Sequence, residues 1–405
     1  MAKATFTNVL IAASGADGSW DIVVEDDRIA SVVPAAGGGG DVNDCGGLTA
    51  FPGFIDIHNH GAVGVDVNEA DVDGLVAVGK FLATQGVTAW MPTLVPDSDE
   101  AYRRAIDAID RLIEVQTEMP IAQAVGVHYE GVFANEKMCG ALRPEYFRSF
   151  HNGSPAEEKR GIAQSTKAHE KTRNGISLRR LKNGLHMTTF APEIEGGIEL
   201  AGELARQKWI ASIGHTRADV AVLEAAFKLG ARHVTHFFNA MTGIHHRDIG
   251  VAGWAASNPE VTFDIIADGI HVHPRMLEMA TRTKGTDKVL LISDSVAPTG
   301  LGDGEFELWG EKVTVENKRT RNERGSIAGS VISMFDAFKG MRSIGFSAAE
   351  VARMASTNPA KLLGLESSHG SLQPGMRADI VLIGPDGSIR SVLIGGRFVS
   401  NWSTR

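Results

Sequence analysis

Eight apolar runs of strand length alternate with helical segments between residues 54 and 295, and no other feature constrains the fold as strongly. In the segments between them, apolar residues recur at three- and four-residue spacing, which predicts amphipathic helices over 71–85, 98–115, 196–208 and 217–230. Strands that alternate with helices form parallel sheets, and eight such units close into a (β/α)8 TIM barrel of the α/β class. The runs cover residues 54–60, 87–93, 124–130, 186–193, 209–216, 233–241, 262–272 and 288–295.

The two ends of the chain have a different pattern. Short alternating runs separated by turn residues, typical of β-strands, cover residues 5–12, 19–34 and 378–399. We expect the two ends to pair into one small β-sandwich domain of residues 1–50 and 376–405, beside a barrel of residues 51–375. After the eighth run, residues 305–318 predict an inserted hairpin, and helical segments follow it.

Composition narrows the class of protein. A formal charge of −9 argues against nucleic acid and anionic membrane surfaces as partners, because both favour basic patches. Cys45 and Cys139 are the only cysteines, so a disulfide scaffold is not expected and a reducing compartment fits. The chain has neither the apolar core of a signal peptide nor an apolar run of membrane-spanning length. We therefore predict a cytoplasmic protein.

Polar residues of ligand or acid–base type end seven of the eight runs. Barrel enzymes carry their chemistry at the carboxyl ends of the strands. This clustering therefore indicates an active site at one end of the barrel. The residues are His58, His60, Glu130, Glu193, His215, His236, Asp268, His271 and Asp294.

The histidines and Glu130 form a candidate metal site. His58 and His60 lie two apart on a strand, so both imidazoles face the same side, where they can hold one metal ion. His215 and His236 end successive strands, and Glu130 can bind one metal or bridge two. A chance His-x-His pair, buried structural histidines and a surface glutamate are the alternative interpretations. Their joint occurrence at strand ends favours the metal.

Asp294 is the candidate general base. A carboxylate beside a metal can take a proton from water and later deliver it to a leaving amine, whereas a helix N-cap is its alternative role. The fourth run contains no lysine that could bridge two metals as a carbamate, which favours Glu130 as the bridge. We expect His128 to be a packed histidine behind the site, and we leave His233, at the start of its strand, outside it.

Several motifs together resemble the N-acetylglucosamine-6-phosphate deacetylases of the amidohydrolase superfamily. The similarity runs almost from end to end, through PGFIDIHNHG, GVHYEG, TFAPE, GHT, SDSVAPTG and NPAKLLGL in the order of the family. Three further motifs are much more specific to this branch, namely THFFNAM (235–241), IADGIHV (266–272) and IAGS (327–330). The resemblance implies a metal-dependent barrel hydrolase that deacetylates a phosphorylated amino sugar.

The resemblance also implies roles for individual residues. Glu130, His215 and His236 would be the main metal ligands, His58 and His60 would complete a second site, and Asp294 would be the base and then the acid. One or two divalent metals per subunit are expected, with zinc first and iron, manganese or cobalt as alternatives. A homodimer is implied, with Arg247 reaching the neighbouring subunit's site. The implied substrate contacts are Ala141, Asn239, Ala240, Arg247, His271, Ile327, Ala328 and Gly329, among which Asn239, Ala240 and Arg247 would hold the phosphate.

Two positions depart from the family pattern. Val132 replaces the usual proline after Glu130–Gly131, and Leu142 stands where the family usually has a substrate-binding histidine. These departures keep open an amidohydrolase acting on another N-acetylated amino-sugar phosphate or another N-acyl compound. A barrel that has lost catalysis and serves as a scaffold is the alternative from another class, although the metal and base residues are all present. No role is assigned to Cys139.

Overall fold

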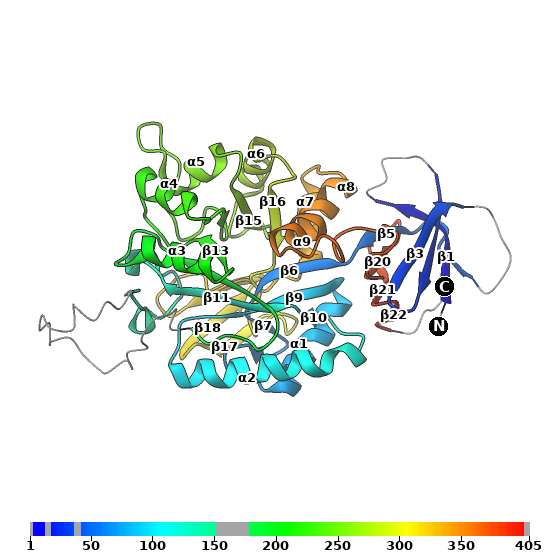
Figure 1. The fold of residues 1–405 in the computed structure, drawn as a ribbon, viewed down its shortest axis with the longest axis horizontal. Helices are drawn as coiled ribbons and strands as arrows, with labels where there is room; N and C mark the ends of the chain where they lie inside the picture. Colours follow the sequence, from blue (N-terminus) through cyan, green and yellow to red (C-terminus); the bar gives the residue numbers. More distant parts are fainter. Residues whose placement is uncertain (1–2, 13–17, 36–41, 151–177, 401–405) are drawn as a thin grey trace, which may run out of the picture.

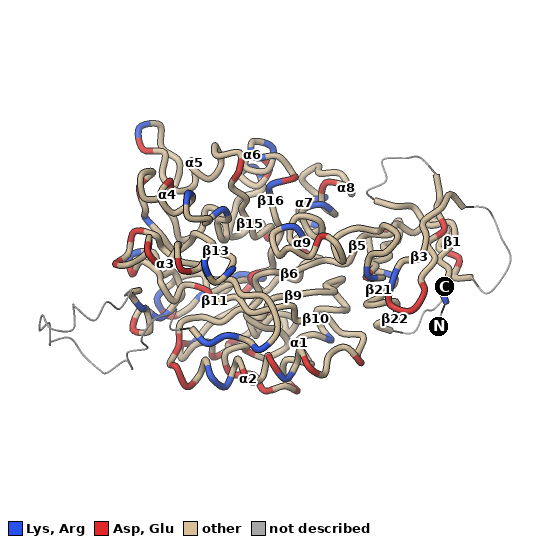
Figure 2. Tube along the Cα trace, in the orientation of Figure 1, with Lys and Arg blue, Asp and Glu red and all other residues tan. Residues whose placement is uncertain are grey.

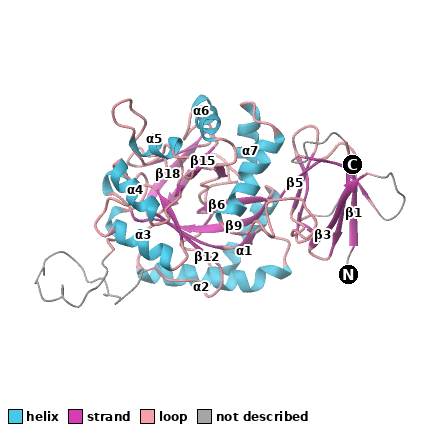
Figure 3. Ribbon diagram, turned by 45° about the horizontal axis from the view of Figure 1, so that its top comes forward, coloured by secondary structure: helices cyan, strands magenta, loops and turns pink. Residues whose placement is uncertain are grey.

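The computed structural model describes residues 3–12, 18–35, 42–150 and 178–400, and its centre is a parallel barrel. Every one of the eight runs contains a strand, and neighbouring strands pair in chain order, so the predicted (β/α)8 barrel is confirmed. Figures 1 and 3 show the strands inside a layer of helices. The barrel strands are β6 (Phe54–Asn59), β9 (Val87–Leu94), β11 (Gly126–Phe133), β12 (Leu185–Phe190), β13 (Ile210–Ile213), β14 (His233–Val234), β15 (Thr262–Ile266) and β16 (Val289–Ile292).

The first and last strands meet just beyond their carboxyl ends. The amide of His60 donates to the Ser295 carbonyl at 2.8 Å, and the amide of Asp294 donates to the His58 carbonyl at 3.0 Å. The buried Asn59 carboxamide reinforces this junction, donating to Ser295 Oγ at 2.7 Å and to Asp56 Oδ2 at 3.1 Å. The closure therefore brings His58, His60 and Asp294 side by side.

Helices cover the outside of the barrel. The four helices predicted from periodicity are present as α1 (Val72–Thr84), α2 (Asp99–Val115), α3 (Gly197–Arg206) and α4 (Val220–Lys228). Both signs of charge lie along α2, where Arg104 pairs with Glu100 at 3.1 Å (Figure 2). Within the described ranges, the structure shows no helix with the length and apolar character needed to span a bilayer. The remaining helical segments are α5 (Gly250–Ser257), α6 (Pro274–Lys284), α7 (Met334–Ser343), α8 (Ala348–Ala352), a π-helix (Arg353–Thr357), α9 (Asn358–Leu362) and 3₁₀ turns at Gln116–Glu118, Glu136–Met138 and Pro144–Tyr146.

Strands from both ends of the chain form a second sheet beside the barrel (Figure 1). Its order is β22-β21-β20-β5-β1-β2-β3, with β4 also paired to β1, and residues from both ends, among them Phe6, Ile22, Ile380 and Leu393, share one buried cluster. Both ends of the chain therefore contribute strands to one sheet, as expected, whereas its arrangement as a β-sandwich domain stays a prediction. The exact boundaries at 50/51 and 375/376 stay a prediction, and residues 1–2, 13–17, 36–41 and 401–405 of that unit lie outside the described ranges. The strands are β1 (Lys3–Ile11), β2 (Trp20–Glu25), β3 (Arg28–Pro34), β4 (Asn43–Asp44), β5 (Thr49–Pro52), β20 (Ile380–Ile383), β21 (Ile389–Ile394) and β22 (Arg397–Phe398).

A small antiparallel sheet is inserted after β16. The predicted hairpin is present as β17 (Gly304–Leu308) and β18 (Glu311–Glu316), and the structure adds a third strand, β19 (Arg319–Asn322). Leu308 and Val313 of this sheet pack on Val296 and Ala328, which lie after β16 and after β19. The insert is thereby fixed to the segment that carries Asp294. Three short strands complete the structure: β7 (Gly61–Ala62), β8 (Val65–Asp66) and β10 (Gln123–Ala124).

Replacing Asn59 by alanine tests the closure of the barrel. The change leaves the buried Asp56 carboxylate and the Gly61 amide without their carboxamide partner, so we expect the free energy of unfolding to fall by about 1–3 kcal/mol. Urea unfolding followed by circular dichroism measures it. Gln373→Ala, at an exposed amide, is the control and should change stability by less than about 0.5 kcal/mol. Equal effects of the two variants would contradict the proposed contribution of Asn59.

Candidate metal centre

Six side chains with metal-ligand chemistry converge at the carboxyl ends of the barrel strands. They form two groups of three, and the ligand atoms within each group lie within 4.8 Å of one another. All six side chains are almost completely buried; even Asp294, the most exposed, is only 7% exposed. The groups are His58, His60 and Asp294, and Glu130, His215 and His236.

Glu130 joins the two groups. Its Oε1 atom lies 3.0 Å from Nε2 of both His215 and His236, and its Oε2 atom lies 3.2 Å from Nε2 of His60. On the other side, Asp294 Oδ1 lies 3.4 Å from His58 Nε2 and 3.3 Å from His60 Nε2. A carboxylate that faces both groups with different oxygens has the geometry of a bridging ligand, as expected from the sequence.

Hydrogen bonds on the far side of three imidazoles orient their Nε2 atoms inward. Nδ1 of His215 donates to the Met138 carbonyl at 2.7 Å, and Nδ1 of His60 and of His236 donates to the carbonyls of Thr93 and Asn239, each at 3.2 Å. A proton held on Nδ1 leaves the Nε2 lone pair free, which is how metal-binding histidines are prepared. The donor set therefore fits a divalent metal.

The charge of the centre leads to the same conclusion. Burial alone would lower the pKa of His60, but hydrogen bonds to Asp294 and Glu130 outweigh it and raise that pKa to about 10. For His236, burial is again outweighed, mainly by Glu130, and the pKa rises to about 9. Two buried carboxylates thus require positive charge nearby, which either protons or a divalent cation supply.

Three residues of the centre have a backbone conformation that non-glycine residues rarely adopt. The φ angles of His215, His236 and Asp294 are 47°, 33° and 50°. Left-handed backbone at such residues costs free energy and persists only where the surrounding structure enforces it.

The match to known proteins extends over most of the chain. Residues 49–399 match the amidohydrolase family. The chain belongs to this family. It is 34% identical over 338 residues to N-acetylglucosamine-6-phosphate deacetylase of Bacillus subtilis, covering 83% of this chain and 81% of that protein. It is also 32% identical to N-acetylgalactosamine-6-phosphate deacetylase of Escherichia coli O157:H7, covering 86% of this chain and 87% of that protein.

Solved structures of the same branch of the amidohydrolase family share the fold. N-acetylglucosamine-6-phosphate deacetylase from Pasteurella multocida is 25% identical, with a TM-score of 0.86 over 99% of this chain and 100% of that one. A mutant of the Mycobacterium smegmatis enzyme, in complex with N-acetyl-D-glucosamine-6-phosphate, is 28% identical, with a TM-score of 0.83 over 98% and 99% of the two chains. The resemblance seen in the sequence motifs is thereby confirmed.

Other residues considered in the sequence lie around the amidohydrolase centre. His128 packs against the His58 ring at 4.7 Å and hydrogen-bonds Thr189 at 2.8 Å, as expected of a histidine behind the site. His233 pairs with Asp264 at 2.9 Å at the start of its strand. Glu193, which lies three residues after the end of β12, hydrogen-bonds Asn135, Thr216 and Arg217 outside the two groups.

The predicted substrate residues lie on loops that follow the strands. His271 Nδ1 donates to Asp268 at 2.6 Å, Ala328 is buried, and Gly329 has a φ of 58°. Ala141, Asn239, Ala240 and Ile327 are half-buried. The backbone amide of Asn239 already donates to the His236 carbonyl at 2.8 Å. To bind a phosphate as well, this amide would have to be shared between the two acceptors. Arg247 is exposed and its guanidinium donates to His246 at 2.7 Å, so the described chain holds it outside the centre.

Both departures from the family pattern are buried next to Glu130. Val132 is fully buried, and Leu142 is 3% exposed. A Cβ added to Gly131 would lie 2.2 Å from Leu142 Cδ1, so the leucine packs directly over the residue after Glu130. Leu142 thus places an apolar group against Gly131 where the family pattern has an imidazole.

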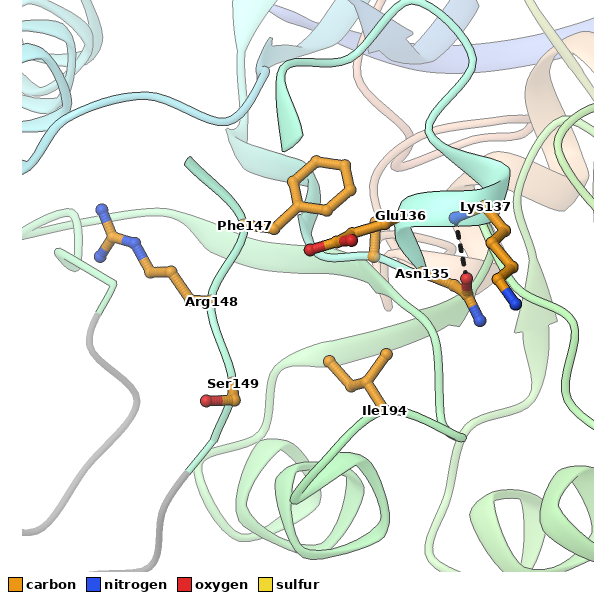
Figure 4. Close-up of a pocket in the computed structure, with 8 residues that line it drawn as sticks. Asn135, Glu136, Lys137, Phe147, Arg148, Ser149 and Ile194 are labelled. Atoms are coloured by element: carbon orange, nitrogen blue, oxygen red, sulfur yellow. Dashed lines mark hydrogen bonds between the residues drawn. The ribbon is translucent and has the colours of Figure 1, made fainter. Parts of the chain in front are cut away.

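The sequence reasoning missed Trp309 and Asp66. The Trp309 ring lies 5.4 Å from the His60 ring, edge to face, and burial raises the pKa of the nearby Asp66 carboxyl to about 6. Neither residue belongs to a strand-end motif, so no local pattern marked them. A separate cavity of about 440 Å³ borders the loop after β11, but none of its lining residues belongs to the two ligand groups; it is lined by Ala134, Asn135, Glu136, Lys137, Phe147, Arg148, Ser149 and Ile194 (Figure 4).

Metal affinity should rise with pH. In the metal-free protein the raised pKa values keep His60 and His236 protonated below about pH 9, so a metal must displace their protons. We expect the affinity for Zn²⁺ to rise about tenfold per pH unit for each displaced proton between pH 7 and 9. Competition with a chromophoric chelator measures it. His60→Asn should lower the slope of the logarithm of the affinity against pH by about one, the value for one displaced proton. A Zn²⁺ affinity that does not change with pH would contradict the charge argument.

Proposed function

We propose that the protein deacetylates N-acetylglucosamine 6-phosphate to glucosamine 6-phosphate and acetate in a metal-dependent reaction. The observation that carries the proposal is Glu130, which faces both histidine groups while Asp294 adjoins one of them. This is the arrangement needed to activate water against an amide. The naming of the relatives and the substrate in the M. smegmatis complex support the choice of sugar.

Glu130, His215 and His236 would hold one metal, and His58 and His60 would contribute to a second. When bound, a divalent cation supplies Lewis acidity that lowers the pKa of water and polarises a carbonyl. Zinc is our first choice because imidazole and carboxylate ligands suit it, with iron, manganese and cobalt as alternatives. Each group has two imidazoles, but Asp294, the carboxylate of the second group, is also assigned to proton transfer, so we expect that group to bind metal more weakly.

Asp294 is the residue that moves the proton. Hydrogen bonds and positive charge from His58 and His60 outweigh its burial and lower its pKa, so the carboxylate is ready to accept. It takes a proton from the attacking water at Oδ1 or Oδ2, and it then delivers that proton to the amine nitrogen as the carbon–nitrogen bond breaks. Its place at the closure of the barrel fixes it against the two histidines.

The substrate contacts are assigned to loop residues. His271, oriented by Asp268, would contact the sugar, and the phosphate would be held by Asn239, Ala240 and an Arg247 guanidinium. Because Arg247 is exposed, we propose that it serves the neighbouring subunit of a homodimer. Ala141 and the turn of Ile327, Ala328 and Gly329 would border the sugar. The cytoplasmic location also stays a prediction.

The epimer N-acetylgalactosamine 6-phosphate is the second candidate substrate. The relative from E. coli O157:H7 that acts on it is 32% identical to this chain, close to the 34% of the B. subtilis enzyme. Leu142 adds a structural reason, since it replaces an expected imidazole with an apolar group beside Glu130. The chemistry of the centre is the same for both sugars.

Acetate release from four sugars decides between these substrates. They are N-acetylglucosamine and N-acetylgalactosamine, each with and without the 6-phosphate. We expect the highest kcat/KM for N-acetylglucosamine 6-phosphate, and Asp294→Asn should lower kcat by about 10²–10⁴-fold because the proton carrier is lost. A higher kcat/KM for N-acetylgalactosamine 6-phosphate would identify that sugar as the substrate instead. Turnover independent of the phosphate would contradict both.

Glu130→Gln tests the bridging carboxylate directly. The amide keeps the shape but lacks the charge, so we expect the metal content of the purified protein to fall well below that of wild type. Inductively coupled plasma mass spectrometry measures it. Glu193→Gln is the matched control, since Glu193 follows the next strand, β12, and lies outside both groups, and it should retain metal. A wild-type protein without stoichiometric metal would favour the scaffold alternative.

A further inference from the structure

The last strand of the inserted sheet contacts two segments to which substrate contacts were assigned. We call residues 138–142 the first substrate segment and residues 327–329 the second. They come from opposite ends of the barrel sequence, after β11 and after β19. Thr320 on β19 touches the second segment, and Arg324, just after β19, touches the first.

Thr320 fixes the second segment with one hydroxyl group. The side chain is 1% exposed; its Oγ1 donates to the Gly329 carbonyl at 2.7 Å and accepts from the Ala328 amide at 3.1 Å. Both bonds are made by a buried group, so removing the hydroxyl leaves a buried carbonyl and a buried amide unpaired. The conformation of this turn therefore depends on β19.

Arg324 fixes the first segment through a short chain of contacts. Its Nη2 donates to the Ala141 carbonyl at 3.0 Å, and its Nε lies 2.9 Å from Glu311 Oε1 on β18. Asn322 Nδ2 donates to the other oxygen of Glu311 at 2.8 Å, which holds that carboxylate in place. The planar guanidinium makes both contacts at once through two different nitrogens held in a fixed geometry.

The first segment in turn reaches the metal centre. The Met138 carbonyl accepts the Nδ1 proton of His215 at 2.7 Å, and the amide of Asn135, just before the segment, donates to the His215 carbonyl at 2.9 Å. On the other side of the insert, Trp309 lies against His60. The inserted sheet therefore spans the mouth of the barrel between loops that belong to different strands.

We propose that Thr320 and Arg324 are positioning residues that set the relative placement of the two substrate segments, and hence the fit of the sugar. Naming a sugar as the ligand rests on the proposed function. Neither residue is proposed to touch the substrate. The metal ligands and Asp294 lie at strand ends of the barrel, so loss of positioning should weaken substrate binding and leave the chemical step in place.

Two variants and two matched controls test this inference. Arg324→Gln removes the guanidinium that contacts the first segment. Thr320→Val removes the hydroxyl that contacts the second segment. Arg321→Gln and Thr314→Val make the same replacements at exposed positions that lie opposite each other in the β18–β19 pair. Metal content and melting temperature are measured for all four proteins.

Hydrogen exchange gives a readout that needs no substrate. In Arg324→Gln, amides of residues 138–142 should exchange about three- to tenfold faster than in wild type, the factor expected for one hydrogen bond. In Thr320→Val, the amides of Ala328 and Gly329 should exchange faster than in wild type by the same factor. Unchanged exchange at these amides, or equal changes in the controls, would overturn the proposal even if the protein acts on another substrate.

Steady-state kinetics separates positioning from a general loss of structure. On the best substrate of wild type, each variant should raise KM about three- to tenfold with kcat within about twofold and metal content unchanged. A fall in kcat at constant KM, or loss of metal, would overturn the proposal, because the contacts would then support the centre itself. Inactivity of wild type on every sugar phosphate would instead refute the proposed function, while the exchange experiment still decides the positioning.

Discussion

The burial of two carboxylates in the mouth of the barrel is the constraint on which the rest of the structure depends. Glu130 and Asp294 are 4% and 7% exposed, and an unpaired buried carboxylate is very costly. Four imidazoles therefore surround them, with Nε2 atoms directed inward. Protons on His60 and His236 can balance this charge up to about pH 9, whereas a divalent cation balances it by coordination at higher pH as well. The site thus favours metal binding through its electrostatics as well as through its ligands.

Holding the imidazoles in this arrangement requires the loops as well as the strands. The carbonyls of Thr93, Met138 and Asn239 each accept an Nδ1 proton, and they belong to three different strand–loop junctions. His215 and His236 also adopt left-handed backbone, a strained conformation that a flexible loop would relax. The rigid barrel below and the hydrogen bonds above together keep the ligands in place. Displacing one of these three carbonyls would therefore alter metal binding without touching a ligand.

Much of the fold and the clustering of the six candidate ligand residues could be predicted from the sequence, because both follow from periodic rules. Apolar runs give the strands, and the barrel architecture places the residues that end them in one site. The partners of the ligands could not be predicted, since a backbone carbonyl such as that of Met138 has no sequence signature. The contacts of Trp309 and Arg324 could not be predicted either. They reach the centre through the packing of an inserted sheet, and no local pattern encodes such packing.

The residues that could be predicted and those that could not lie in different parts of the molecule and have different assigned roles. The groups assigned to the activation of water lie on barrel strands or just after them, where a shift of register would misplace every ligand. The groups assigned to the sugar lie on loops held by the insert and by short hydrogen-bonded turns. Leu142 lies between the two regions, on the first substrate segment yet packed over Gly131 beside Glu130. A replacement at this position can change the shape offered to the sugar without removing a ligand, so the substrate can diverge in this family while the reaction is retained.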